Sequence, residues 1–100
     1  MVTSGTRLRS QVCDTEVIVV RPSASLDDLR VGGVPMVPLG APAVAGVTLD
    51  ADFAEGTILG KRYVDGSGAE VLVTKPGIGT LSIGRVPMSL KGAEPLPASD

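Results

Sequence analysis

The sequence predicts a small all-β domain, arranged as a barrel or sandwich of about eight short strands. Three observations lead to this fold class. Hydrophobic residues make up 43% of the chain, and with one Phe, one Tyr and no Trp they are mostly Val, Leu, Ile and Ala; β-branched side chains such as Val and Ile favour strands. Glycine pairs and prolines separate the apolar stretches at the places where turns are needed. An internal repeat predicts that the strands form two tandem β-meanders.

The repeat relates residues 5–40 to residues 60–92. Its longest matches align Glu16–Pro22 with Glu70–Pro76 and Leu29–Met36 with Leu81–Met88, and the second pair ends in the same Val-Pro-Met triplet. Identities that keep their order over this length indicate duplication of an ancestral unit.

Each unit is expected to contain four strands. Proline ends the second strand because it has no N–H to donate to a ladder. Glycine at the turn between the third and fourth strands suits the positive φ of a tight hairpin. The strands start near Arg7 or Arg62, cover Glu16–Arg21 or Glu70–Lys75, and flank Gly32-Gly33 or Gly84-Arg85.

The connector between the units is apolar and is not expected to be a solvated linker. The four consecutive apolar residues Val17–Val20 need cover on both faces of their strand, and the connector is the candidate for that role, packed across the sheet. Asp50 or Asp52 is expected to cap a helical turn over Ala51–Glu55, which Gly56 ends.

The length of 100 residues suits a single domain. The predicted organisation is one domain over residues 1–100, with repeat one at 5–40, the connector at 41–59, repeat two at 60–92 and a loose C-terminal tail at 93–100.

Composition excludes several classes of partner. The net charge is −2 and charges of both signs are spread along the chain, so no basic stripe is expected for nucleic acid, and almost no aromatic rings are present to stack on bases. No apolar run approaches the roughly 20 residues of a membrane span. The N-terminal residues lack the pattern of a signal peptide, which predicts a soluble, cytoplasmic protein.

The residue types present predict no catalytic site, cofactor or metal. The chain has no His and one Cys, which removes nucleophile–histidine pairs and the usual zinc sites. The acidic neighbours Asp14 and Glu16 are expected to raise the pKa of Cys13, because a thiolate needs a base or a positive charge nearby. A structural thiol is therefore expected.

Two further motifs are expected to be structural. The segment Gly56–Arg62 resembles a phosphate-binding loop, but three residues separate its glycines where four are required, and a strand is expected to follow it. Asp50, Asp52 and Glu55 lack the further oxygen ligands of a calcium loop. A turn and a helix cap explain these residues.

Two stretches, Val12–Pro22 and Leu29–Met36, together with Thr74–Gly77, resemble small β-rich actinobacterial proteins of unassigned function. The resemblance covers most of the chain. It implies further cysteines near the positions of Val31 and Val73, with a metal or redox role in that group, and this chain departs from the pattern. It implies no activity, substrate or catalytic residue.

These observations predict a non-enzymatic protein-binding or accessory protein that self-associates as a homo-oligomer. The alternative is a small-molecule-binding β-barrel, and an enzyme that uses carboxylates or a lysine is a third hypothesis. The first unit keeps apolar residues where the second accepts Thr74, Ser89 and Lys91, and an apolar edge strand invites pairing. The expected interface consists of Val20, Val34, Met36, Val37 and Leu39.

Overall fold

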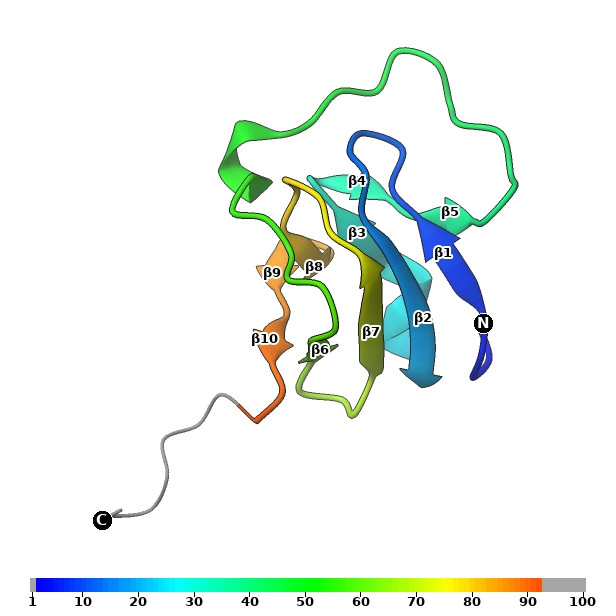
Figure 1. The fold of residues 1–100 in the computed structure, drawn as a ribbon, viewed down its shortest axis with the longest axis vertical. Coiled ribbons are helices and arrows are strands. Elements are labelled where there is room, and N and C mark those ends of the chain that lie inside the picture. Colours follow the sequence, from blue (N-terminus) through cyan, green and yellow to red (C-terminus); the bar gives the residue numbers. More distant parts are fainter. Residues whose placement is uncertain (1, 93–100) are drawn as a thin grey trace.

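The computed structural model describes residues 2–92, which form ten strands and two short 3₁₀ helices (Figure 1). The six-stranded sheet A has the order β10-β6-β7-β2-β1-β5, and the four-stranded sheet B has the order β4-β3-β8-β9. The strands are β1 (Arg7–Arg9), β2 (Glu16–Arg21), β3 (Leu29–Val31), β4 (Val34–Pro35), β5 (Val37–Pro38), β6 (Arg62–Val64), β7 (Glu70–Lys75), β8 (Leu81–Ile83), β9 (Val86–Pro87) and β10 (Ser89–Leu90). The all-β prediction is confirmed, but the sheets are not closed into a barrel.

Both sheets are antiparallel and are built around a central pair of strands. In sheet A, β2 pairs with β7, and Ile18 lies opposite Leu72. In sheet B, β3 pairs with β8, and Arg30 lies opposite Ser82. In each sheet the strands outside the central pair follow in matching positions, so that β1 and β6, β5 and β10, and β4 and β9 occupy equivalent places.

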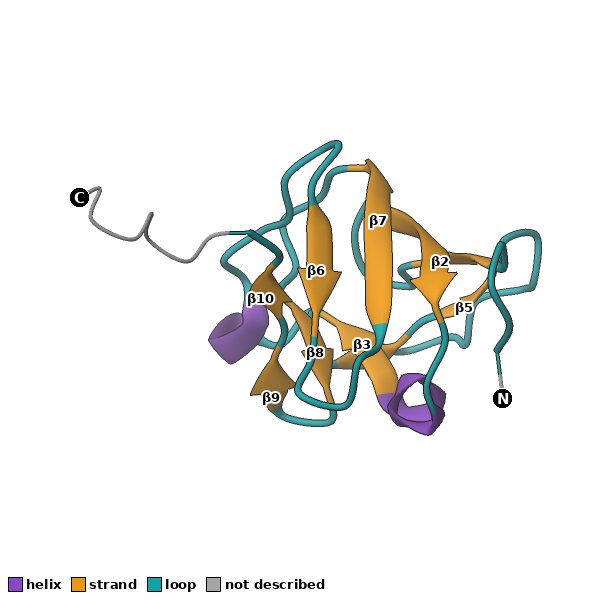
Figure 2. Cartoon of the chain, turned by 90° about the horizontal axis from the view of Figure 1, so that it is seen from below, coloured by secondary structure: helices purple, strands orange, loops and turns teal. Residues whose placement is uncertain are grey.

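The structure has ten strands, not the expected eight, because two segments each contribute to both sheets. Within residues 34–38, β4 pairs with β3 in sheet B and β5 pairs with β1 in sheet A. Within residues 86–90, β9 pairs with β8 in sheet B and β10 pairs with β6 in sheet A. The change of partner occurs at Met36 and at Met88, whose N–H groups donate to Leu29 and Leu81. These bent segments form corners between the two sheets (Figure 2).

The predicted turns form as expected. Gly32 and Gly33 have φ of 65° and 80° between β3 and β4, a conformation that favours glycine. In the β6–β7 turn, the Asp65 carboxylate accepts hydrogen bonds from the backbone N–H groups of Ser67 and Ala69 at 3.1 and 2.9 Å. Burial raises the pKa of Asp65, but hydrogen bonds from Ser25, Ser67 and Ala69 outweigh it and lower the pKa.

The core lies between the sheets and draws residues from both halves of the chain. In β1 and β6 the middle residues, Leu8 and Tyr63, are buried while their neighbours face outwards or are half-buried, which is the alternation of a half-covered strand. The buried cluster consists of Leu8, Val17, Val19, Leu26, Leu29, Val31, Tyr63, Ala69, Val71, Val73, Leu81 and Met88.

The connector does not pack across the strand Val17–Val20, and this prediction is wrong. It passes over the turn ends of sheet B instead (Figure 1), where Asp50 N–H donates to the carbonyl of Gly32 and Thr80 N–H donates to the carbonyl of Phe53. The outward residues Ile18 and Val20 are therefore only half-buried.

The helix cap in the connector is confirmed. Asp50 accepts a hydrogen bond from Asp52 N–H at 2.9 Å and caps the 3₁₀ helix η2 (Ala51–Phe53), which is shorter than the expected turn. A second 3₁₀ helix, η1 (Ala24–Asp28), follows β2 and buries Leu26. No helix formed by residues 2–92 is long or apolar enough to cross a membrane. The predicted loose tail, residues 93–100, lies outside the described residues.

Candidate interaction surface

The fold separates the charges that the sequence spreads along the chain. Of the nine lysines and arginines, five lie on strands of sheet A and two more directly adjoin them, whereas only two acidic residues lie on these strands. The cationic residues are Arg7, Arg9, Arg21, Lys61, Arg62, Lys75 and Lys91, and the acidic ones are Glu16 and Glu70.

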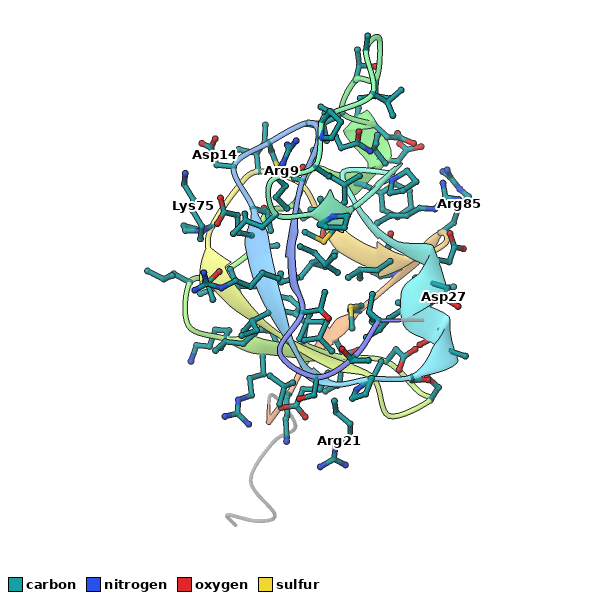
Figure 3. The ribbon with its side chains drawn as sticks, turned by 90° about the vertical axis from the view of Figure 1, so that its right-hand side faces the viewer. Arg9, Asp14, Arg21, Asp27, Lys75 and Arg85 are labelled. Carbon is teal, nitrogen blue, oxygen red and sulfur yellow. The ribbon has the colours of Figure 1, made fainter. Side chains whose placement is uncertain are left out.

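Strand alternation directs several of these cations away from the core. Because Leu8 and Tyr63 are buried, their neighbours Arg7, Arg9 and Arg62 point to the opposite side of sheet A. Figure 3 shows Arg9 and Lys75 on the side of sheet A and Asp27 and Arg85 on the far side of the molecule. We call the side of sheet A that faces away from the core the outer face.

Most of the remaining acidic residues among 2–92 lie near sheet B and its loops. On that side the two arginines are paired: Arg30 Nε lies 3.0 Å from Asp28, and Arg85 lies 3.6 Å from Asp50 and 3.9 Å from Asp52. The Arg85 guanidinium also stacks on the Phe53 ring, 4.9 Å from its centroid. The cations of this side are therefore occupied, and the outer face of sheet A carries the excess positive charge.

The centre of the outer face is aliphatic. Ile18 and Leu72 lie opposite each other on β2 and β7, and both are half-buried, as is Val20. At the two ends of this central pair, Glu16 lies opposite Lys75 and Arg21 lies opposite Glu70. The outer face thus has an aliphatic middle with charged residues around it.

Glu70 is the most buried charged side chain of the outer face, with 4% of its side chain exposed. Its carboxylate accepts hydrogen bonds from Lys91 Nζ at 2.9 Å and from Arg62 at 3.1 Å. The hydrogen bond from Lys91 and the charges of both cations lower the pKa of Glu70, against the opposing effect of burial. Beside it lies an open hollow of about 580 Å³, whose lining includes Arg21, Glu70 and Lys91.

The first half has an equivalent but smaller hollow of about 240 Å³, lined in part by Arg7, Glu16, Leu39 and Lys75. Leu39 stands at the position that Lys91 occupies in the second half. Glu16 is only half-buried, and the leucine that replaces Lys91 cannot donate a hydrogen bond to its carboxylate.

The residues of the expected interface do not form one exposed patch. Leu39 is 43% exposed, Val20, Met36 and Val37 are half-buried, and Val34 is buried. Met36 packs against the core. Among residues 2–92, the large apolar side chains with the greatest exposure are elsewhere: Val44, Ile58, Leu59, Ile78 and Val86.

Cys13 lies in a group of hydroxyl side chains at the β1–β2 turn. Its thiol is half-buried, 3.4 Å from Ser10 Oγ and 3.3 Å from Thr15 Oγ1. Burial raises the pKa of Cys13, but hydrogen bonds from Ser10, from Thr15 and from the backbone of Gly79 outweigh it and lower the pKa. The expectation that acidic neighbours raise this pKa is therefore wrong. Asp14 is adjacent in sequence, but it is exposed.

The segment Gly56–Arg62 forms a turn that leads into β6, where Gly60 N–H donates to Val73 and φ of Gly60 is 79°. Among residues 2–92, no group of three or more Cys, Asp or Glu side chains is placed to hold a metal ion. No family model, curated protein or solved structure matches this chain.

Sequence reasoning missed the outer face of sheet A. The signal for it is present in the alternation Arg7-Leu8-Arg9, where cations flank a core residue. That signal is short, and it becomes a surface only when the register places β1, β2, β7 and β6 side by side.

Proposed function

We propose that this chain is a non-enzymatic protein-binding domain, and that the outer face of sheet A binds an acidic surface of another protein. The observation that carries this proposal is the grouping of cations around an aliphatic centre on one sheet, in a chain whose net charge is −2. Opposite charges across an interface steer association and fix orientation, and an aliphatic centre with a polar rim is the usual anatomy of a protein interface.

The outer face fits a protein better than a nucleic acid. Phosphates would leave the half-buried Ile18 and Leu72 without a partner, and Glu16 and Glu70 would repel them. The two aromatic side chains are buried, Tyr63 in the core and Phe53 on the connector, so they do not offer a platform for stacking bases.

We also infer that the two halves arose by duplication. Support comes from the matching segments in the sequence and from the equivalent places that their strands occupy in both sheets. A duplicated unit accounts for the two related hollows on the outer face, one around Glu16 and one around Glu70. The proposed surface thus consists of two similar charged regions that flank one aliphatic centre.

A pair of matched double variants tests the proposal. Arg7→Gln with Lys75→Gln removes two positive charges from sheet A, and Arg30→Gln with Arg85→Gln removes two from the other side. With poly-L-glutamate as the probe and titration followed by NMR, we expect the first pair to weaken binding by about tenfold and the second to change it less than twofold. Binding of the native chain should weaken as salt increases.

Three outcomes would contradict the proposal. The native chain shows no shifts with poly-L-glutamate, or both variant pairs lose affinity equally, which would indicate overall charge and not a surface. A 20-base-pair DNA duplex that binds more tightly than poly-L-glutamate, with shifts on the same strands, would identify the outer face as a nucleic-acid surface instead.

A further inference from the structure

The four edge strands of the two sheets each have one residue whose backbone groups face away from the sheet. In an antiparallel pair, the residues alternate between those bonded to the neighbouring strand and those that point outwards. The bonds Met36 N–H to Leu29, Leu39 N–H to Arg7, Met88 N–H to Leu81 and Lys91 N–H to Arg62 fix this alternation. The outward residues are therefore Pro35 on β4, Pro38 on β5, Pro87 on β9 and Leu90 on β10.

Three of these four residues are prolines. Proline has no N–H, so an added strand finds no donor at these positions, and proline on an edge is a known protection against unwanted pairing. In β4 and β5 the carbonyls are occupied as well: Pro35 accepts from Gln11 Nε2 at 2.8 Å, and Pro38 accepts from Ala41 N–H at 2.9 Å. The edges of the first half are closed to both donors and acceptors.

Leu90 is the exception. It occupies in β10 the place that Pro38 occupies in β5, and it retains its N–H. The ladder with β6 leaves the Leu90 N–H and carbonyl on the open side of β10, and no other group among residues 2–92 bonds to them. The Leu90 side chain packs against the core, so the strand is held in place while its edge remains unpaired.

We propose that β10 pairs antiparallel with β10 of a second copy about a twofold axis, with Leu90 opposite Leu90. One exposed donor and one exposed acceptor on the same residue complement themselves under this symmetry, and each N–H donates to the other copy's carbonyl. The contact joins the two copies of sheet A into one continuous sheet. It lies at the β10 edge of sheet A, beside the outer face, and does not rest on the protein-binding function proposed above.

The charges beside β10 are compatible with this pairing. In the register that places Leu90 opposite Leu90, Lys91 of one copy lies opposite Ser89 of the other, so like charges do not meet directly. Lys91 and Arg62 are also held on the buried Glu70 carboxylate, at 2.9 and 3.1 Å. The Glu70 carboxylate thus offsets part of the charge of the two cations nearest the edge within each copy.

The test compares the full-length native chain with Leu90→Pro and Leu90→Ala by sedimentation velocity from 10 to 300 µM. Leu90→Pro removes the N–H and should weaken dimerisation by about tenfold or more, because both N–H···O bonds of the twofold contact are lost. Leu90→Ala removes most of the side chain but keeps the N–H, and should still dimerise. The double variant Leu90→Pro with Pro38→Leu has an N–H on β5, the opposite edge of sheet A, but none at position 90. It should not regain dimerisation through β10.

Hydrogen exchange of the native chain tests the pairing without a variant. The Leu90 amide should become more protected as concentration rises, whereas amides of exposed loop residues such as Ala45 should not change. Raising the salt to 0.5 M should leave the dimer intact, since backbone bonds form it, although the same salt weakens poly-L-glutamate binding at the outer face. A native chain that stays monomeric to 300 µM, or a Leu90→Pro variant that dimerises like the native chain, overturns the proposal.

Discussion

The two halves of the molecule share one strand order but have different surfaces. Val34 of the first half is buried, whereas Val86, at the equivalent position, is 71% exposed. Pro38 closes the edge of β5, whereas Leu90 leaves that of β10 unpaired. Gln11 also joins β4 to the connector through hydrogen bonds with Pro35 and Val44. Equivalent strands therefore do not imply equivalent surfaces.

The largest expected effect comes from exchanging a turn residue between the halves. Gly77 follows Pro76 as Ser23 follows Pro22, but a Cβ on Gly77 would lie 2.6 Å from Thr15 N and 3.0 Å from Asp14 N. These are backbone atoms that cannot move aside cheaply, so Gly77→Ser should destabilise the fold by about 3 kcal/mol.

The reverse exchange is the control. Ser23 is half-buried and its hydroxyl bonds to Ser67 at 2.8 Å, so Ser23→Gly should cost about 1 kcal/mol or less. Urea unfolding of both variants measures the difference. Equal losses would show that the two turns are interchangeable.

An intermediate effect on the free energy of unfolding is expected when threonine replaces Val34 or Val86, the valines at equivalent positions of the two halves. Val34→Thr buries an unpaired polar group and should cost about 1.5 kcal/mol. Val86→Thr places the same group in water and should change the free energy of unfolding by less than about 0.5 kcal/mol. Thermal unfolding of the two variants checks this, and a Val86→Thr variant that loses as much as Val34→Thr would show that Val86 is covered in solution.

The smallest expected effect on stability at neutral pH concerns Glu70, whose contribution is recognised by its dependence on pH. Because the folded state lowers its pKa below the ordinary value of about 4.3, ionised Glu70 contributes stability at neutral pH that is lost as the pH falls through the lowered pKa. Lys91→Leu introduces the residue of the first half and raises this pKa towards its ordinary value. The loss of stability below about pH 5 should therefore become less steep.

Leu39→Lys serves as the control for the acid-dependent effect. It adds an exposed lysine near Glu16 and should change stability by less than about 1 kcal/mol. Circular dichroism melting curves from pH 3 to 7 compare the variants with the native chain. An unchanged pH dependence in Lys91→Leu would mean that Arg62 alone sets the pKa of Glu70.

The strands and turns were predictable because their signals are local. The strand Glu16–Arg21, the turn at Gly32 and the cap at Asp50 each depend on residues that are neighbours in the chain. The division into two sheets was not predictable in this way. It depends on the change of pairing partner at Met36 and Met88, and nothing in the triplet Val-Pro-Met marks a corner.

The candidate surface was less predictable than the fold. Neither the net charge nor the spread of charges along the sequence shows that lysines and arginines group on sheet A. That grouping arises from the register of four strands. Apolar composition also does not reveal exposure, so it did not show which residues of the expected interface lie at the surface. Val34 and Leu39 are both apolar, yet the fold buries one and exposes the other.

The central pair of sheet A has a consequence for how the chain reaches its native state. β2 and β7 pair residue 18 with residue 72, so the pairing of the two middle strands encloses β3, β4, β5, the connector and β6 in one long loop. Closing such a loop costs entropy before most of the contacts that repay it exist. Contacts between residues far apart in sequence slow folding. The chain should therefore fold in milliseconds to seconds and not in microseconds, and neither half, made alone, would have the neighbour that completes its sheet.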